Sequence, residues 1–354
     1  MKILLLGEFS GLHKNLKDGL VELGHDVTIS ATGDGWKRIP CDIDLSVSGN
    51  GLVAKVKRRL FYFKYLLSVR NFDVVQIVNA DLLSLSLFPN KFMLDYLVKN
   101  NGKVYLLGAG DDAYFWMYGR AALKYGPFDD CLKYDLGTKR SRFETKKKLE
   151  LNGYIANQVS GVIPIMYEYA VAYKDMDNLL PIVPIPINTD EIVCEKSDSG
   201  GGFVVFHGLN RPGFKGTHYI ESAFGILQKK YPEVEFVIKG KMRLNEYLQL
   251  MSRATVIIDQ VNSHSLGVNG LLAMAMGKVV LGGVEQESLD AFGIERSPAI
   301  NVRPDVNDIV DKVSRVIELG PEKINALGRE SRMFVEKNHN YELVAKKYIE
   351  VWNC

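Results

Sequence analysis

Two cations in the C-terminal half of the sequence have the spacing of an anion-binding loop. Arg211 and Lys215 follow the apolar run 202–208, which ends at Gly208, and a helix is predicted to begin near Thr217. Both cations would then lie beside the free backbone N–H groups of a helix start. Arginine grips phosphate oxygens through two N–H groups, and lysine adds a point charge. The loop therefore predicts a phosphate or diphosphate site; a solvated basic loop is the alternative.

A second glycine-bearing segment precedes another predicted helix, at 269–276. Gly267 and Gly270 flank the start of this helix, close to Asn269. Glycine lets a ligand approach the backbone closely, and the first turn of a helix offers unpaired N–H groups and the positive end of its dipole. We predict that these three residues face a ligand, whereas the alternating Ala and Met residues at 273–276 pack into the core.

The loop after the first predicted strand, residues 7–13, contains Ser10, Gly11 and His13. It lacks the G-x-G-x-x-G fingerprint, and no acidic residue closes a second strand about 20 residues on, so a nicotinamide cofactor is disfavoured. The three residues are candidates to line an acceptor site. His13 is equally compatible with a surface position near the start of a helix.

Two neighbouring carboxylates, Asp111 and Asp112, follow the predicted strand 103–107. The carboxyl end of a parallel strand faces the ligand crevice of an open α/β sheet, so either side chain can bind an acceptor hydroxyl or act as a base. Aspartate is also a good helix N-cap. One carboxylate capping a helix while the other is functional is an assignment that the spacing leaves open.

The elements that must position these residues alternate between strand and helix. Apolar runs predict strands at 2–6, 26–30, 72–78, 103–107, 157–165, 202–208, 234–240, 255–261 and 278–283, and helical spacing predicts helices at 216–229, 244–251, 269–276 and over most of 305–354. The proline-rich stretch 179–192 reads as a linker between domains. Two doubly wound parallel sheets follow from this alternation.

The bulk composition agrees with two globular domains. The chain has 354 residues, of which 47% are hydrophobic and 24% charged, and its net charge of +2 implies no general attraction to nucleic acid. Four scattered cysteines (Cys41, Cys131, Cys194 and Cys354) disfavour a disulfide framework or a zinc site and favour a reducing cytoplasm. The first apolar run is too short for a signal peptide, and none reaches the about 18 residues of a membrane span.

Two segments are strongly basic. Residues 52–66 carry five cations, no acidic residue and several aromatics, and residues 138–148 carry six cations and one acid. A basic-aromatic helix can lie against the anionic inner face of a membrane, which predicts peripheral membrane contact. A solvated helix face is the commoner explanation.

At these residues the sequence resembles the family-4 glycosyltransferases of GT-B fold, over nearly the whole chain. HGLNRPGFKG (207–216) looks like the family's arginine and lysine loop, and GLLAMAMGKVVLGG (270–283) resembles its L-E-A-M-A-x-G-K-P-V-V stretch. The opening residues 1–28 and the closing helix 334–352 also look family-like. The resemblance implies that Arg211 and Lys215 hold a donor diphosphate, that transfer retains the anomeric configuration, and that neither a metal nor a cofactor is needed.

The sequence departs from the family at two positions. The family's two glutamates, separated by seven residues, align with His264 and Leu272. In the family the first lies by the donor sugar and the second binds the ribose. Leucine cannot accept a hydrogen bond, so Asn269, Glu285 or Glu287 becomes a candidate for ribose binding. In the first domain the family's H-G-S-D-like stretch would align near GAGD, which places its aspartate at Asp111.

These observations predict a GT-B fold, in which two Rossmann-like domains with doubly wound parallel sheets face a cleft. We expect an acceptor domain at 1–184, a donor domain at 185–335, and a closing helix at 336–354 that crosses back to the first domain. Gly240 and Lys241 would approach the nucleotide base, and His264 would lie by the donor.

The function that this interpretation predicts is sugar transfer from a nucleotide-sugar donor to a glycan or lipid-linked acceptor, in surface polysaccharide or glycan synthesis. The alternatives are a nucleotide-sugar epimerase of the same fold, and a non-catalytic protein that binds nucleotide sugars. An oxidoreductase ranks last, because the dinucleotide fingerprint is missing.

Overall fold

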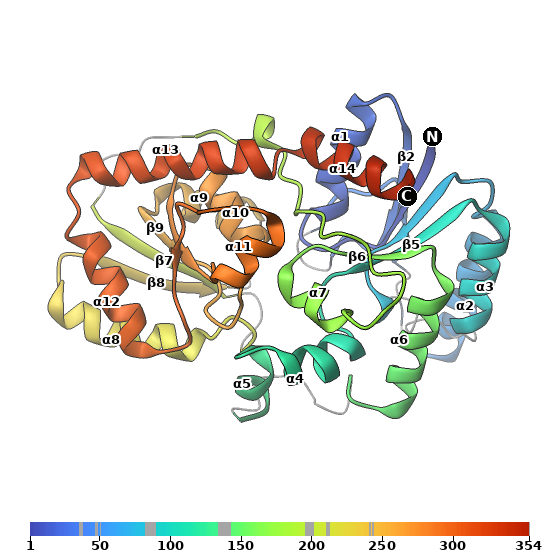
Figure 1. Cartoon of the computed structure of the whole chain (residues 1–354), viewed down its shortest axis with the longest axis horizontal. Helices are drawn as coiled ribbons and strands as arrows, with labels where there is room; N and C mark the ends of the chain where they lie inside the picture. The colour runs from blue at the N-terminus through green and yellow to red at the C-terminus, as the bar shows by residue number, and fades with distance from the viewer. Residues whose placement is uncertain are drawn as a thin grey trace. The chain divides into compact units, whose positions relative to one another are not determined.

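The computed structural model describes residues 1–34, 38–46, 49, 51–81, 90–133, 143–194, 202–209, 213–240, 242 and 244–353. The chain divides into two compact units, and Figure 1 labels most of their helices and several of their strands. The first unit contains Met1–Ala122, Ser141–Pro186 and Tyr341–Cys354, and the second contains Leu123–Arg140 and Ile187–Asn340. Residues 123–140, which fall inside the first domain predicted at 1–184, group with the second unit.

A parallel six-stranded sheet forms the centre of the first unit, in the order β3-β2-β1-β4-β5-β6. Its strands are β1 (Lys2–Leu6), β2 (Asp26–Ala31), β3 (Ile43–Asp44), β4 (Val74–Ile77), β5 (Lys103–Gly108) and β6 (Gly161–Pro164). Ile3, Leu4 and Leu5 of β1 are all buried, as expected for a parallel strand covered on both faces. Because β1, β4 and β5 run parallel, the loops after them lie at one edge of the sheet.

Helices connect these strands and cover the sheet. They are α1 (Leu12–Glu22), α2 (Leu52–Ser68), α3 (Asn90–Asn100), α4 (Arg120–Ala122), α6 (Lys146–Gln158), α7 (Tyr167–Ala172) and α14 (Tyr341–Asn353). The C-terminal helix α14 packs against α1, so closely that a Cβ at Gly19 would lie 2.4 Å from the Tyr341 carbonyl oxygen. The indole Nε1 of Trp352 donates to Gln76 Oε1 in β4 at 3.3 Å, which fastens the end of the chain to the first sheet.

A parallel five-stranded sheet forms the centre of the second unit, in the order β11-β10-β9-β7-β8. Its strands are β7 (Val204–Leu209), β8 (Glu235–Gly240), β9 (Val256–Ile258), β10 (Val279–Gly282) and β11 (Ile300–Asn301). Its helices are α5 (Pro127–Lys133), α8 (Thr217–Lys230), α9 (Leu244–Arg253), α10 (Val268–Ala275), α11 (Gln286–Phe292), α12 (Val306–Ile317) and α13 (Pro321–Asn338). Ile220 and Leu227 of α8 pack with Val313 of α12 in one core cluster.

The predicted alternation of strands and helices is confirmed in both units. The helix predicted at 269–276 is α10, and its Ala273, Met274 and Ala275 are buried, so the packing interpretation of this face is also confirmed. The two-residue strands β3 and β11 were not predicted, because so short an apolar run gives no periodic signal.

Candidate functional site

The loop between β7 and α8 is built around close backbone approaches. Gly216, the N-cap of α8, has φ +71°, and a Cβ there would lie 2.4 Å from Val261 Cγ2. A Cβ at Gly208 would lie 2.4 Å from the Tyr247 hydroxyl oxygen. Only glycine fits both positions without displacing neighbours. Gly208, in β7, therefore lies against α9, and Gly216 lies against Val261, which follows β9. Arg211 lies outside the described residues.

A buried ion pair joins this loop to the end of β9. Lys215 is only 7% exposed, and its Nζ lies 3.0 Å from Oδ1 of the fully buried Asp259. The second carboxylate oxygen of Asp259 accepts a hydrogen bond from the Gly267 backbone N–H at 3.0 Å. Lysine has three N–H donors, so this contact leaves donor capacity on Lys215. One carboxylate therefore holds the predicted phosphate lysine beside the N-terminus of α10.

His207 joins the end of β9 to the start of α8. Its Nδ1–H donates to the Ile258 carbonyl at 2.8 Å, and its Nε2 accepts from the Thr217 hydroxyl at 3.0 Å. Burial, with a further contribution from the charge of Lys215, lowers the pKa of His207 to about 4. The neutral ring fits this donor and acceptor arrangement and adds no charge beside Lys215.

The N-terminus of α10 lies beside Asp259. A Cβ at Gly270 would lie 2.8 Å from Asp259 Oδ2, so a side chain at this position would crowd the carboxylate. Asn269, in the first turn, is half-buried, and no hydrogen bond joins its side chain to any described residue. Gly267, Asn269 and Gly270 are thus brought together with Lys215, as one cluster at the carboxyl edge of the second sheet.

His264 lies in the same loop, but in a different setting. Its ring is buried and stacks on the Tyr125 ring, with centroids 4.3 Å apart and planes 16° apart. Tyr125 belongs to the segment 123–140, which precedes and includes α5 and groups with the second unit. The same segment reaches this loop through Asp130, whose Oδ2 accepts from Asn262 Nδ2 at 2.6 Å.

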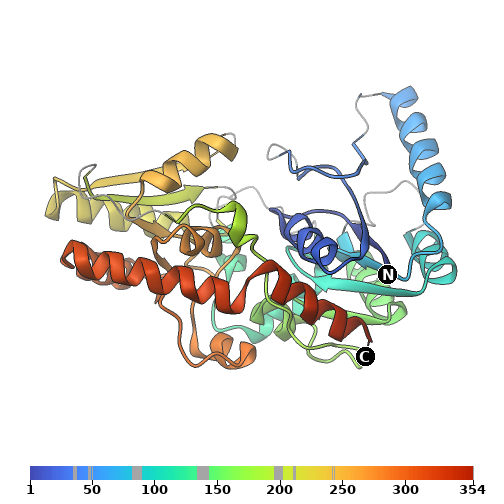
Figure 2. The ribbon, with the colours of Figure 1, turned by 90° about the horizontal axis from the view of Figure 1, so that it is seen from above.

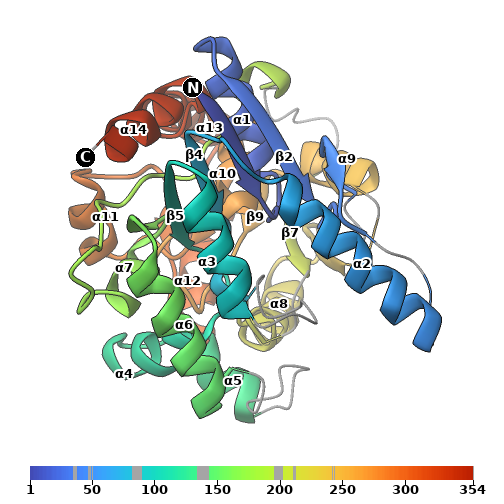
Figure 3. The ribbon, with the colours of Figure 1, turned by 90° about the vertical axis from the view of Figure 1, so that its right-hand side faces the viewer.

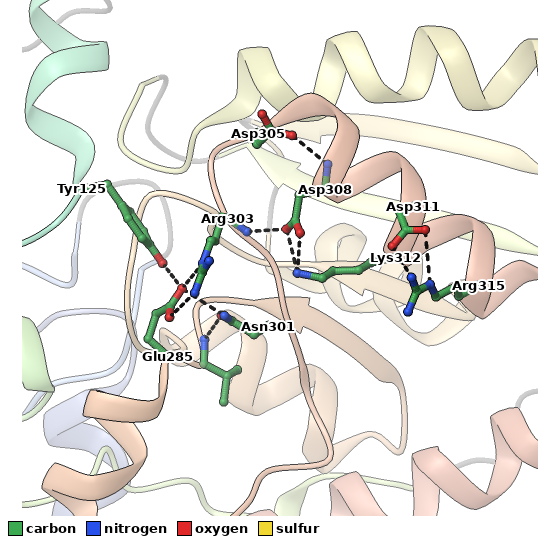
Figure 4. A network of polar contacts seen from close by, with 10 residues as sticks. Tyr125, Glu285, Asn301, Arg303, Asp305, Asp308, Asp311, Lys312 and Arg315 are labelled. Atoms are coloured by element: carbon green, nitrogen blue, oxygen red, sulfur yellow. Dashed lines mark hydrogen bonds and ion pairs between the residues drawn. The ribbon is translucent and has the colours of Figure 1, made fainter.

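The carboxylate of Glu285, which follows β10, is held by hydrogen bonds from three neighbouring side chains (Figure 4). Its carboxylate accepts hydrogen bonds from Arg303 Nε (2.8 Å) and Nη2 (3.0 Å), from Asn301 Nδ2 (3.0 Å) and from the Tyr125 hydroxyl (2.8 Å). These bonds, above all those from Arg303, lower the pKa of Glu285 to about 2. Glu287 forms an ion pair with Lys124 at 2.5 Å. Both carboxylates therefore have protein partners.

At the end of β8, Gly240 serves strand packing. A Cβ there would lie 1.7 Å from the Leu209 carbonyl oxygen, so β7 and β8 could not pair at this register with any other residue. Lys241 lies outside the described residues.

In the first unit, the loop after β1 is organised by a buried carboxylate. Glu8 Oε1 accepts from the Gly11 N–H at 2.9 Å, and Oε2 accepts from the Lys14 N–H at 2.8 Å, which satisfies the start of α1. Burial raises the pKa of Glu8 to about 7. Ser10 has φ +58° and its N–H donates to Asp34 Oδ2 at 2.9 Å. Ser10 and Gly11 remain half-exposed at this strand end.

His13 lies in the interior of the first unit. Its Nδ1–H donates to the Gly7 carbonyl at 2.7 Å, and its Nε2 accepts from Gln76 Nε2 at 3.2 Å. Burial lowers the pKa of His13 to about 4. The ring is 0% exposed, so His13 neither lines an acceptor site nor lies at the surface near the start of α1, as the sequence had suggested. It supports the loop that carries Ser10.

Asp111 and Asp112 follow β5 and have different surroundings. Asp112 is 1% exposed: its Oδ1 accepts from the Phe115 N–H at 2.8 Å, and its Oδ2 accepts from the Tyr173 hydroxyl at 2.6 Å. Burial raises the pKa of Asp112 to about 6. Asp111 is half-buried, and its Oδ1 accepts from Trp116 Nε1 at 3.2 Å. Asp112 has the geometry of the cap, and Asp111 is the more accessible carboxylate.

The loops that carry these residues meet. A Cβ at Gly110, which has φ +69°, would lie 3.0 Å from Cε2 of Phe9. The loop after β1 and the loop after β5 are therefore in contact, which brings Ser10 and Gly11 close to Asp111.

Sequence reasoning missed Asp259, Glu8 and Tyr125 as organising residues. A signal existed for Asp259, because a single carboxylate directly after the buried run TVII is a strand-end position.

None of the helices in the described ranges has both the length and the apolar composition that a bilayer span requires. The described residues also contain no group of three or more His, Cys, Asp or Glu side chains arranged to bind a metal ion.

Two α/β units with parallel sheets are the architecture of the GT-B fold, and comparison with solved structures confirms that fold. The chain is similar to HepE from Anabaena, solved in complex with UDP-glucose, with a TM-score of 0.64 and 12% identity over 99% of each chain. It is also similar to sucrose-phosphate synthase from Thermosynechococcus elongatus, with a TM-score of 0.63 and 14% identity over 100% of this chain and 98% of that one.

A third similar structure is a putative UDP-N-acetylglucosamine 2-epimerase from Listeria monocytogenes, with a TM-score of 0.55 and 11% identity over 99% of this chain and 95% of that one. No family model matches the sequence, and no curated protein matches it. The similarity therefore lies in the fold, which glycosyltransferases and epimerases share.

Proposed function

We propose that the protein is a glycosyltransferase that moves a sugar from a nucleotide-sugar donor to a glycan or lipid-linked acceptor. The observation that carries this proposal is the buried Lys215–Asp259 pair, which holds a lysine beside the N-terminus of α10. A lysine with spare donors next to a helix start is a site for a diphosphate. HepE, which has the same fold, was solved with UDP-glucose, so a uridine nucleotide is the first donor to test.

The donor diphosphate would lie between Lys215, Arg211 and the first turn of α10. These cations would stabilise the negative charge that grows on the departing diphosphate, so no metal and no cofactor are needed in this proposal. Gly208, Gly267 and Gly270 allow close backbone approach, and Asn269 is the proposed ribose contact. Gly240 with Lys241 is proposed for the base. His264 would border the donor sugar through its loop.

The acceptor would bind to the first unit, at Ser10 and Gly11. We propose that Asp111 contacts the acceptor hydroxyl and receives its proton, while Asp112 fixes the loop as a helix cap. Retention of the anomeric configuration and a role in surface polysaccharide or glycan synthesis are parts of the same proposal. So is a cytoplasmic location at the inner face of a membrane, with contact through residues 52–66 and 138–148; part of the second segment lies outside the described residues.

Isothermal titration with UDP-glucose, after a thermal-shift screen of UDP-, GDP- and ADP-sugars, tests the donor site. Arg211→Ala should weaken binding by about tenfold or more, because a charged hydrogen bond contributes about 1.5–3 kcal/mol. Lys215→Met is made together with Asp259→Asn, since the single change would leave a buried charge unpaired. Lys229→Ala, an exposed cation at the other end of α8, is the matched control.

The donor assignment is refuted if none of the donor-site changes weakens binding more than the control change does. It is also refuted if no nucleotide sugar binds. Product analysis then separates the candidate activities. A glycosyltransferase consumes donor only with an acceptor and forms a linkage of retained configuration, with or without EDTA. Conversion of the donor sugar without acceptor would establish the epimerase that the Listeria similarity raises. Binding without turnover would establish a non-catalytic protein.

A further inference from the structure

Helix α2 exposes a stripe of apolar side chains along its length. Leu52, Val53, Val56, Leu60 and Leu67 are exposed by 80%, 69%, 49%, 55% and 41%. At 3.6 residues per turn, these five positions fall within roughly 100° of the helix circumference. Single exposed leucines are ordinary, but a continuous apolar stripe marks an interaction surface.

A different face of α2 attaches the helix to its unit. Leu66 is buried, the Tyr62 hydroxyl donates to the Leu45 carbonyl at 3.0 Å, and Arg58 Nη2 donates to the Gly49 carbonyl at 3.2 Å. At the same periodicity these three residues fall on an arc of the helix that does not overlap the apolar stripe. Figures 2 and 3 show α2 at the margin of the first unit, with one end projecting beyond α3. The stripe is thus turned away from the core of its own unit.

Cations border the apolar stripe on both sides. Lys55 and Arg59 fall along one edge, and Lys57 and Lys64 fall along the other. The helix contains no acidic residue, so its positive charge is not offset on its own surface. An apolar stripe between two rows of cations is the pattern of a helix that lies in a membrane interface, with aliphatic side chains among the acyl chains and cations at the headgroups.

We propose that α2 docks the protein on an anionic lipid bilayer, with the stripe Leu52–Leu67 facing the hydrocarbon. Charge decides between the occupants of this surface. A second copy of the chain would bring two sets of like charges face to face, whereas an anionic bilayer supplies apolar depth and negative headgroups together. The helix is about 25 Å long, which gives an extended contact in the plane of the membrane. This inference rests on the part of the proposed function that places the chain at a membrane.

Vesicle sedimentation with the full chain tests the inference, using phosphatidylcholine vesicles with and without about one-third phosphatidylserine. The wild type should bind the anionic vesicles, and binding should weaken as salt is raised. Changing Lys55, Lys57, Arg59 and Lys64 to Gln should reduce the partition coefficient by up to about 1,000-fold. Val56→Ser with Leu60→Ser should reduce it by at least about tenfold. All of these positions are exposed, so circular dichroism and melting temperature should match the wild type.

The matched control changes four exposed cations elsewhere, Lys323, Arg329, Lys346 and Lys347, to Gln, which alters the net charge by the same amount. It should bind vesicles nearly as well as the wild type. Equal loss in control and α2 variants, or equal binding to uncharged vesicles, overturns the inference. So does a concentration-dependent dimer, seen by analytical ultracentrifugation, that the serine changes abolish. Titration of UDP-glucose with the same variants separates this outcome from failure of the donor site.

Discussion

Replacing Asp112 with Asn should change the pH dependence of stability. The Asp112 carboxyl is buried and its pKa rises from 3.8 to about 6. A raised carboxyl pKa means that the folded protein favours the protonated form of Asp112. The contribution of this one group to stability is therefore largest below pH 3.8 and is lost as pH rises through 6. A shift of about two units corresponds to about 3 kcal/mol, most of which is lost between pH 4 and 6.5. The amide of Asn carries no charge and avoids this loss.

The comparison of wild type and Asp112→Asn isolates this one group, because every other titration is common to both proteins. Asn keeps an acceptor for the Phe115 N–H but disturbs the bond from Tyr173, which costs about 1 kcal/mol at all pH values. The variant should therefore be about 1 kcal/mol less stable than the wild type near pH 4 and about 2 kcal/mol more stable than it at pH 7. Denaturant melts at pH 4, 5, 6 and 7, with Asp111→Asn as the neighbouring control, measure this. A stability difference that stays constant across the series would refute the reasoning.

Two further perturbations concern the second unit. Lys215→Met should destabilise the protein by about 3–5 kcal/mol, because it leaves the buried charge of Asp259 without its cation. The double variant with Asp259→Asn should recover most of this loss; a single variant that melts like the wild type would contradict the buried pair. Glu285→Gln should lower the melting temperature at pH 7, through loss of about 2 kcal/mol of charged hydrogen bonds from Arg303. Because the pKa of Glu285 is lowered from 4.5 to about 2, the wild type loses this stabilisation progressively as pH falls from 4.5 through 2, so the two melting temperatures should approach each other over this range; a constant gap would be the contrary result.

The strands and the glycine loops could be predicted because their signals are local. A buried parallel strand reads as an unbroken apolar run, as at 2–6, and the turns into α8 and α10 carry glycine at the positions where backbone must pass closely. The same logic placed Gly267 and Gly270 at a helix start without knowledge of the sheet order. These features depend on residues within one turn or one strand of each other.

The partners of the site residues could not be predicted, because they come from distant parts of the chain. Lys215 and Asp259 are 44 positions apart and meet only because β7 pairs with β9. Tyr125 stacks on His264 because the segment 123–140 belongs to the second unit, although the rest of the chain before residue 187 belongs to the first. Neither composition nor periodicity indicates that this segment groups with the second unit. The division of roles between Asp111 and Asp112 depends on which carboxyl points back at the Phe115 N–H, which is a matter of local backbone geometry.

The partners of Glu285 and Glu287 bear directly on donor recognition. If the resemblance to family-4 glycosyltransferases holds, Leu272 takes the position of that family's ribose-binding glutamate. In this structure Glu285 accepts four hydrogen bonds and Glu287 pairs with Lys124. A ribose contact by Glu285 would compete with the hydrogen bonds from Arg303 and Tyr125, and one by Glu287 would compete with its ion pair to Lys124. Asn269, in the first turn of α10, would face no such competition, because no hydrogen bond joins its side chain to another described residue. We therefore expect the Asn269 amide, with one acceptor and two donors, to take the place of the carboxylate. Donor binding should then be weaker, and less dependent on pH, than in a protein that binds the ribose through a glutamate.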